Sequence, residues 1–249
     1  QSIILQREKM RDFGESTVVG GNHKTTRGYE ISVRNNKSTD IVIEIQDQIP
    51  ISSNKEIEVD LIDEAIVNQK DLVVLPETSI PTVLNKNHYI LDVLKMKSQQ
   101  IDILTGALYL ENDLIYNATY FISKGEVQIA KKVVLVPFGE EIPLPQVLVD
   151  LINDIFYNGA KDYSKADKAT DFVIKGQKIR NAICYEATTD KIFEDLNGVK
   201  YMIATSNNAW FTPSIEPTLQ KLLMKYYARK YDITIFHVVN GSSNDIIRP

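Results

Sequence analysis

Residues 71–108, DLVVLPETSIPTVLNKNHYILDVLKMKSQQIDILTGAL, decide the fold class of this 249-residue chain. The apolar run 71–76 is followed by a stretch with helical spacing, 84–100, and then by a second apolar run, 101–108. A strand, a helix and a strand in this order are typical of an α/β protein. Such folds place reactive side chains in the loops at strand ends, which directs attention to Glu77.

The same alternation continues on both sides of this segment. Upstream, apolar residues within 61–66 have helical spacing. Turn residues at Lys124-Gly125 and at Gly176 predict two hairpins. Residues 61–249 are therefore expected to form a mixed sheet with helices on its face. The remaining pattern predicts strands at 116–123, 125–131, 170–175, 178–184, 200–206 and 233–239, and helices near 146–156 and at 215–231.

The first sixty residues have a different pattern. Residues 28–35 and 40–47 alternate apolar and polar side chains, as half-buried strands do. The intervening Asn-Asn-Lys-Ser, residues 35–38, has turn chemistry, so a β-hairpin is predicted. The chain is therefore expected to have two parts: a β-rich segment, 1–60, and an α/β domain, 61–249.

Composition excludes several classes of protein. A single Cys rules out an internal disulfide and a Cys-rich zinc site, and three scattered His leave little for a metal site. The net charge of −5 argues against a nucleic-acid-binding surface. No apolar run reaches the ~18 residues of a membrane-spanning helix. The chain reads as soluble, with no metal and no cofactor expected.

Three apolar strands are followed by side chains that could carry chemistry. Because strand ends are where α/β folds place their sites, these residues are the candidates for a catalytic centre. LVVLPE ends at Glu77, VQIAKKVVLVPFGEE contains Lys132 and Glu140, and RNAICYE contains Cys184 and Glu186.

Each of these residues also has an ordinary structural explanation. A lone cysteine is most often an inert core residue, and an isolated glutamate or lysine is most often solvated. The functional alternative makes Cys184 a nucleophile activated by a neighbouring base or cation. The three histidines lie in unrelated contexts, so the base would have to be a carboxylate such as Glu77. The residue types alone do not choose between Lys131 and Lys132.

The contexts LPETSIP, KVVLVPFGEEIP and ICYE, in this order, resemble the nitrilase, or carbon–nitrogen hydrolase, superfamily. Within it, LVPFGEEIPLP, TSNNAWF and TGALYLENDLIYNATYFIS look most like the apolipoprotein N-acyltransferase family. The resemblance covers about 61–249. It implies a nitrilase-like α-β-β-α sandwich with mixed sheets, preceded here by the β-rich segment.

The resemblance also implies a Glu-Lys-Cys triad. Glu77 matches the general base, Cys184 the nucleophile, and Lys132, three residues before LVP, the cation that stabilises the oxyanion together with the backbone N–H after the cysteine. Three further residues match positions that support the site or adjoin the nucleophile: Glu140, Tyr185 and Glu186.

In the resembled acyltransferase family, a phospholipid donates an acyl group through a cysteine thioester to the N-terminal cysteine amine of a lipoprotein. The implied location is a periplasm-facing domain at the bacterial inner membrane. That family surrounds this domain with membrane helices, so an excised extramembrane domain is expected, with membrane contact only through segments outside this chain. The resemblance leaves the oligomeric state open.

Residues 27–59 instead resemble part of a β-sandwich domain of unknown function in mucoidy-inhibitor-like bacterial proteins. Taken together, the two resemblances predict a composite chain whose nitrilase-like half lacks its first strand, which puts the activity of the chain in question. Two alternatives to the acyltransferase stay open. One is a soluble carbon–nitrogen hydrolase such as an amidase, and the other is a non-catalytic β-rich binding or surface module.

Overall fold

A computed structural model describes residues 3–9, 16–19, 22–25, 29–35, 55–137, 139–141, 163–211 and 214–249. The chain divides into two compact units, residues 1–47 and residues 48–249. No helix in the described ranges is both long enough and apolar enough to cross a bilayer.

The described residues of the smaller unit are β-strands. β1 (Ile3–Lys9) pairs antiparallel with β4 (Tyr29–Asn35), and β2 (Ser16–Val19) pairs antiparallel with β3 (Asn22–Thr25). The predicted strand at 28–35 is confirmed as β4. Its predicted partner, 40–47, lies outside the described residues, and the partner that the structure gives is β1.

The larger unit contains two mixed sheets. In the first sheet, β5 and β6 run parallel to β7, whereas β8 is antiparallel to both β7 and β9. As a result β5, β7 and β9 all run in the same direction, and their C-terminal ends lie at the same end of the sheet. The bounds are β5 (Leu72–Val74), β6 (Ile80–Val83), β7 (Asp102–Glu111), β8 (Leu114–Ser123) and β9 (Glu126–Lys131).

The second sheet has the order β10–β11–β12–β13–β14. Its three central strands, β11, β12 and β13, are parallel, and the two edge strands are antiparallel to their neighbours. The predicted hairpin around Gly176 is the β10–β11 pair. The bounds are β10 (Asp171–Ile174), β11 (Gln177–Ile183), β12 (Tyr201–Asn207), β13 (Thr234–Asn240) and β14 (Asp245–Ile247).

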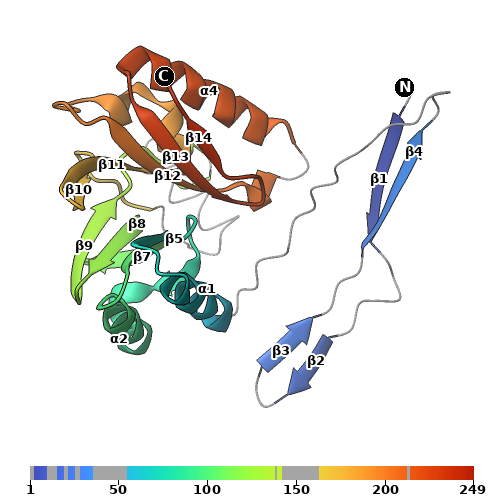
Figure 1. Cartoon of the computed structure of the whole chain (residues 1–249), viewed down its shortest axis with the longest axis horizontal. Helices are drawn as coiled ribbons and strands as arrows, with labels where there is room; N and C mark the ends of the chain where they lie inside the picture. Colours follow the sequence, from blue (N-terminus) through green and yellow to red (C-terminus); the bar gives the residue numbers. More distant parts are fainter. Residues whose placement is uncertain are drawn as a thin grey trace, which may run out of the picture. The chain divides into compact units, whose positions relative to one another are not determined.

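Helices cover the outer faces of the two sheets (Figure 1). α1 (Lys55–Val67) and α2 (His88–Lys97) lie on the first sheet, and α4 (Glu216–Tyr231) lies on the second. Short 3-10 turns follow several strands: η2 (Leu84–Lys86), η3 (Cys184–Thr188), η4 (Asp190–Phe193) and η5 (Asn208–Phe211).

Strand alternation produces three layers of core. Ile103 packs under the helices of the first sheet, whereas its neighbour Leu104 points to the opposite face and packs between the sheets. On β12, Met202 packs under the helix of the second sheet, and its neighbour Ile203 packs between the sheets. Because successive side chains in a strand face opposite sides, strands that are apolar throughout are what a sheet covered on both faces requires. The α-β-β-α sandwich predicted from the resemblance is therefore confirmed.

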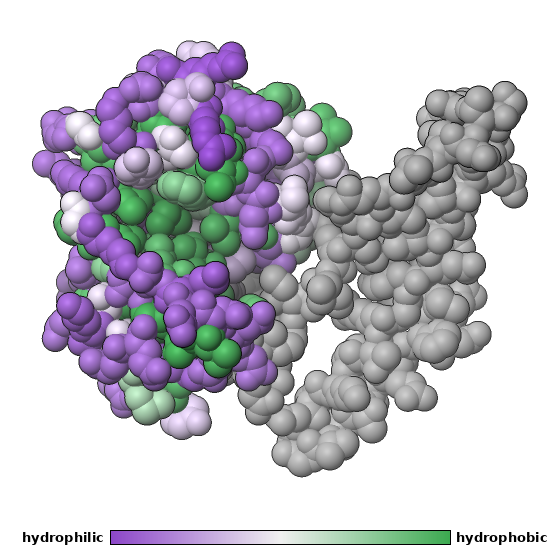
Figure 2. All heavy atoms as spheres, in the orientation of Figure 1, coloured by the Kyte–Doolittle hydropathy of each residue, from purple (hydrophilic) through white to green (hydrophobic). Residues whose placement is uncertain are grey.

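Figure 2 shows apolar side chains in the seam between the two halves of the larger unit, whereas the surrounding surface is mostly hydrophilic. The core between the sheets consists of Leu104, Phe121, Ala130, Phe172, Ile174 and Ile203.

Most of the elements predicted for 61–249 are present, with three differences. The stretch 84–100 divides into η2 and α2, because Asn87 interrupts the helix and its side chain accepts a hydrogen bond from the Ile90 N–H as an N-cap. β6 and β14 were not predicted, since Pro81 within β6 argues against a strand and β14 has only two apolar residues, Ile246 and Ile247. The helix predicted near 146–156 lies outside the described residues.

Removal of the Phe121 side chain tests the layered core. Phe121 is buried between the sheets with its ring centroid 5.3 Å from that of Phe172. We expect Phe121→Ala to lower the free energy of unfolding by about 3–5 kcal/mol, measured by urea denaturation. The control is Val173→Ala on β10, where 60% of the side chain is exposed, and the expected change is within about 0.5 kcal/mol. Equal changes in the two variants would contradict this core.

Candidate active site

The three predicted triad residues leave strands at one end of the sandwich. Glu77 follows β5 and Lys132 follows β9. These strands are parallel, so their C-terminal ends lie at the same end of the first sheet. Cys184 follows β11 in the second sheet. The layered fold therefore brings together residues that are more than fifty positions apart in sequence.

The Glu77 side chain is buried and held at both oxygens. Oε1 accepts a hydrogen bond from Asn117 Nδ2 at 2.8 Å and lies 3.5 Å from Lys132 Nζ. Oε2 accepts from the backbone N–H of Asn207 at 3.0 Å. Only 2% of Glu77 is exposed. A carboxylate fixed by three donors is oriented before substrate arrives, which general-base chemistry requires.

Lys132 is the buried cation of the site and has no exposed surface. Its Nζ lies 2.7 Å and 2.9 Å from the two oxygens of Glu140. Burial alone would lower the pKa of Lys132, but the negative charges of the nearby carboxylates, Glu77 foremost and then Glu140, outweigh it, so the net pKa is raised. Lys132 is therefore charged at neutral pH.

Cys184 occupies the first residue of η3 with φ of 53°. This left-handed conformation is unusual for a side chain larger than glycine, and such residues concentrate at functional sites. Burial raises the pKa of the Cys184 thiol, and the nearby Glu77 charge raises it further, although Lys132 opposes them. The resting sulfur is therefore a neutral thiol near a carboxylate.

The two further predicted carboxylates support the triad from opposite sides. Glu140 accepts hydrogen bonds from Asn117 Nδ2 and the Val136 N–H, each at 2.9 Å, besides pairing with Lys132. Glu186 accepts hydrogen bonds from the backbone N–H of Ile183, which precedes Cys184, and from those of Val133 and Val134, which follow Lys132. Burial raises the pKa of Glu186 to about 7 despite these donors.

Tyr185 lies apart from the other predicted residues. Its side chain is 38% exposed and does not line the cavity. Its carbonyl accepts a hydrogen bond from Thr188 Oγ1 within η3. The Tyr185 side chain is therefore not part of the cavity wall.

Two polar residues of the site were not predicted. Asn117 on β8 bridges the two carboxylates Glu77 and Glu140 through one amide nitrogen. Gln220 on α4 places its Nε2 3.8 Å from Cys184 Sγ and 3.3 Å from Ser206 Oγ. Each is an amide on the otherwise apolar, buried face of its strand or helix. A polar residue at such a position is uncommon, and this could have identified both as candidate site residues.

Gly106 on β7 allows the Glu77 loop to lie directly on the sheet. A Cβ at this position would lie 2.6 Å from Thr78 N and 2.8 Å from Glu77 Cα. Both neighbours are backbone atoms, so a larger residue would push the Glu77 backbone away from the other triad residues.

A cavity of about 350 Å³ opens onto the triad. Charged side chains and the thiol form one part of it, and apolar side chains form the rest. It is lined by Glu77, Lys132, Val136, Pro137, Gly139, Glu140, Cys184 and Phe211.

A family model described as carbon-nitrogen hydrolase matches residues 51–236, which is most of the chain and includes all of these site residues. The chain belongs to the carbon–nitrogen hydrolase family. A second family model, a domain of unknown function (DUF4139), matches residues 1–100 and overlaps the first. This second match includes 27–59, where the sequence resembles a domain of unknown function.

Several carbon–nitrogen hydrolase relatives are named apolipoprotein N-acyltransferase. The protein from Wolinella succinogenes is 51% identical over 189 residues, which cover 76% of this chain and 45% of the relative. The protein from Campylobacter jejuni is 42% identical over 80% of this chain and 44% of the relative. The chain therefore spans less than half the length of these two relatives.

Solved structures of carbon–nitrogen hydrolases share the fold at low sequence identity. A superfamily protein from Xanthomonas campestris with an arsenic adduct in its active site has a TM-score of 0.58 and 15% identity, covering 79% of this chain and 78% of its own. An amidase from Nesterenkonia has a TM-score of 0.57 and 13% identity, covering 80% and 75%.

The support from Glu186 can be tested by an isosteric change. Glu186→Gln supplies one acceptor oxygen where a carboxylate supplies two, so at least one of the three N–H groups loses its partner. We expect a loss of roughly 1–3 kcal/mol in unfolding free energy, measured by urea denaturation. The control is Glu111→Gln, which removes the partly exposed ion pair with Lys131 and is expected to cost less than about 1 kcal/mol. If Glu186→Gln has the same free energy of unfolding as the unmodified protein, these hydrogen bonds do not stabilise the fold.

The raised thiol pKa predicts the pH at which Cys184 reacts. We expect the rate of iodoacetamide alkylation to reach half its maximum above pH ~8.5, the ordinary value for cysteine. Glu77→Gln removes a negative charge that raises this pKa, so the midpoint should move to lower pH. The midpoint, unlike the rate, does not depend on access to the buried sulfur. A midpoint below pH ~8 in the unmodified protein would contradict the geometry.

Proposed function

We propose that this chain carries the acyl-transfer centre of an apolipoprotein N-acyltransferase. The observation that carries the proposal is that Glu77, Lys132 and Cys184 line one cavity with an apolar wall, where Lys132 Nζ lies 3.5 Å from Glu77 Oε1. The substrate class rests on the 51% identity to the Wolinella succinogenes relative.

In the first step the Cys184 sulfur attacks the carbonyl carbon of a phospholipid ester while Glu77 takes the thiol proton. Because the thiol is neutral at rest, Glu77 must remove its proton before or during the attack. The negative charge that develops on the carbonyl oxygen is stabilised by Lys132 and by the backbone N–H of Tyr185. Glu77 then returns the proton to the departing lysophospholipid oxygen, and a Cys184 thioester remains.

In the second step the N-terminal amine of a lipoprotein attacks the thioester carbon. Glu77 accepts a proton from the amine, the same donors stabilise the second oxyanion, and the sulfur leaves as the protonated thiol. The products are an amide and the free enzyme, so each residue finishes in its starting state. The proposed partners are therefore a phospholipid donor and a lipoprotein N-terminus.

Glu140, Glu186 and Asn117 act as positioning residues in this mechanism. Glu140 pairs with Lys132, and Asn117 donates to both Glu140 and Glu77, so together they hold Lys132 and Glu77 at a fixed separation. Glu186 ties the backbone after β9 to the end of β11, which supports the position of Lys132 relative to Cys184.

We assign this chemistry to a catalytic domain, 61–249, and treat 1–60 as a separate β-rich segment. The proposed location is the periplasmic side of a bacterial inner membrane, where phospholipid and lipoprotein meet. A soluble amidase of the same family would use the same triad on small amides. The test below therefore distinguishes a phospholipid donor from a small amide.

Intact-mass measurement after incubation with detergent-solubilised phosphatidylethanolamine tests the proposal. We expect the unmodified protein to gain the mass of one acyl chain and Cys184→Ala to gain none. Glu77→Gln should acylate far more slowly, and Lys132→Ala should lose roughly 100-fold or more in rate, as removal of an oxyanion partner does.

The adjacent lysine provides a matched control. Lys131 pairs with Glu111 at 2.6 Å and does not line the cavity, so Lys131→Ala should acylate at nearly the normal rate. An acyl adduct formed from small amides but never from phospholipid would replace the acyltransferase with the amidase. Acylation that survives in Cys184→Ala would reject the triad.

A further inference from the structure

α4 has apolar residues on both its inner and its outer side. On the inner side Met224, Tyr227 and Ala228 are buried against the second sheet. A helix that covers one face of a globular domain normally presents polar residues on the other. The outer side of α4 departs from this rule, which indicates that something covers it.

An apolar stripe runs along the outside of α4. Leu219, Leu222, Leu223 and Tyr226 are spaced three and four residues apart, so they lie on one face of the helix. Leu222 is 55% exposed and Tyr226 57%, and Ile215, just before the helix, is 73% exposed. Monomeric proteins seldom expose this many large apolar side chains in one place.

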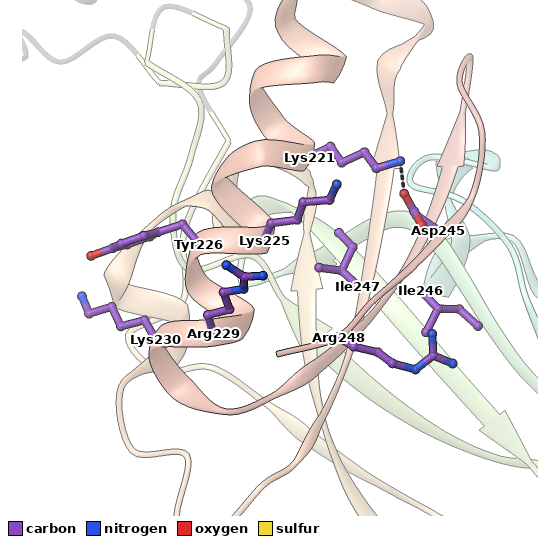
Figure 3. Close-up of a pocket in the computed structure, with 9 residues that line it drawn as sticks. All are labelled: Lys221, Lys225, Tyr226, Arg229, Lys230, Asp245, Ile246, Ile247 and Arg248. Atoms are coloured by element: carbon purple, nitrogen blue, oxygen red, sulfur yellow. Dashed lines mark ion pairs between the residues drawn. The ribbon is translucent and has the colours of Figure 1, made fainter.

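A row of cations borders the apolar stripe. Lys221, Lys225 and Arg229 are each four residues apart, so they form a second face of α4 beside the first. Arg248, directly after β14, also lines the groove beside α4, although Figure 3 shows that its side chain points away from the helix. The groove has a volume of about 960 Å³ and is lined by Lys221, Lys225, Tyr226, Arg229, Lys230, Asp245, Ile246, Ile247 and Arg248.

These cations are only partly neutralised. Lys221 pairs with Asp245, and Lys230 pairs with Asp190 at 2.5 Å. Lys225, Arg229 and Arg248 form no ion pair with any residue in the described ranges. This cluster of five cations belongs to a chain whose net charge is −5. The face is therefore selective for an anionic partner.

We propose that the outer face of α4, with the end of β14, docks on the surface of an anionic phospholipid bilayer. Exposed Leu and Tyr side chains beside Lys and Arg are the combination that helices lying in the membrane interface use. A nucleic acid would leave the apolar stripe exposed. A second copy of the chain, packed through the same face, would bring its cations against these cations.

Docking on this face also concerns the active site, because the inner side of α4 carries Gln220, 3.8 Å from Cys184 Sγ. A bilayer on the outer side would hold the nucleophile within one helix diameter of the membrane surface. In this respect the inference rests on the proposed function, because it places the bilayer that holds the proposed lipid donor next to the catalytic domain.

Vesicle sedimentation tests the docking surface. The full chain, as the Cys184→Ala variant so that no acylation occurs, is mixed with phosphatidylcholine vesicles with or without phosphatidylglycerol. We expect strong binding only to the vesicles that contain phosphatidylglycerol, and weaker binding as salt is raised.

Two double substitutions separate the two parts of the face. Lys225→Gln with Arg229→Gln should weaken partitioning roughly 25-fold, about 5-fold for each cation removed. Leu219→Ser with Leu222→Ser should weaken it by roughly 10-fold or more. Matched controls elsewhere are Lys175→Gln with Lys200→Gln, both exposed cations, and Val173→Ser with Met96→Ser, both exposed apolar residues. The controls should bind as the parent does.

Equal binding to both kinds of vesicle, or equal binding by the face variants and the controls, would overturn the proposal. So would a dimer, detected by light scattering, that the face variants convert to monomers. The charge variants alter only exposed side chains, so they remain informative if the leucine variants unfold. Acylation by detergent-solubilised phospholipid needs no bilayer, so failure of docking and failure of the proposed function are separate results.

Discussion

The buried ammonium of Lys132 is the interaction on which the site depends. A charge without exposed surface is tolerated only when opposite charges and hydrogen bonds replace its water. Glu140 and Glu77 supply the charges, and Asn117 and the backbone near Asn207 hold those carboxylates in turn. Removing one member leaves another buried and unpaired. The charged cluster and the fold around it are therefore stabilised together, and the thiol is placed where this cluster can act on it.

The layered architecture explains why this cluster can exist at all. The carboxylate and the ammonium leave parallel strands of one sheet, and the sulfur leaves the other sheet, so the reacting groups meet only if the two sheets pack in one register. The core between the sheets, with Phe121 against Phe172, fixes that register. Stability of the core and geometry of the site are thus consequences of the same packing.

Apolar runs and helical spacing predicted the α/β pattern and the helix at 215–231, and the turn residue Gly176 predicted the hairpin. The pattern missed β6, which contains Pro81, and β14, which has only two apolar residues. The approach of Glu77, Lys132 and Cys184 followed from the order of motifs and from family resemblance, because spacing along a chain carries no distance in space. Asn117 and Gln220 were missed because an amide within an apolar element acquires its meaning only from the groups that it contacts.

Gly106 has a consequence for how such a protein can change over evolutionary time. The loop that carries Glu77 lies on the backbone of β7 with no room for a methyl group between them. A side chain at position 106 would therefore displace the Glu77 backbone from the sheet. Natural variation is expected to be more restricted at Gly106 than at the apolar residues of the cavity wall, such as Val136 and Phe211.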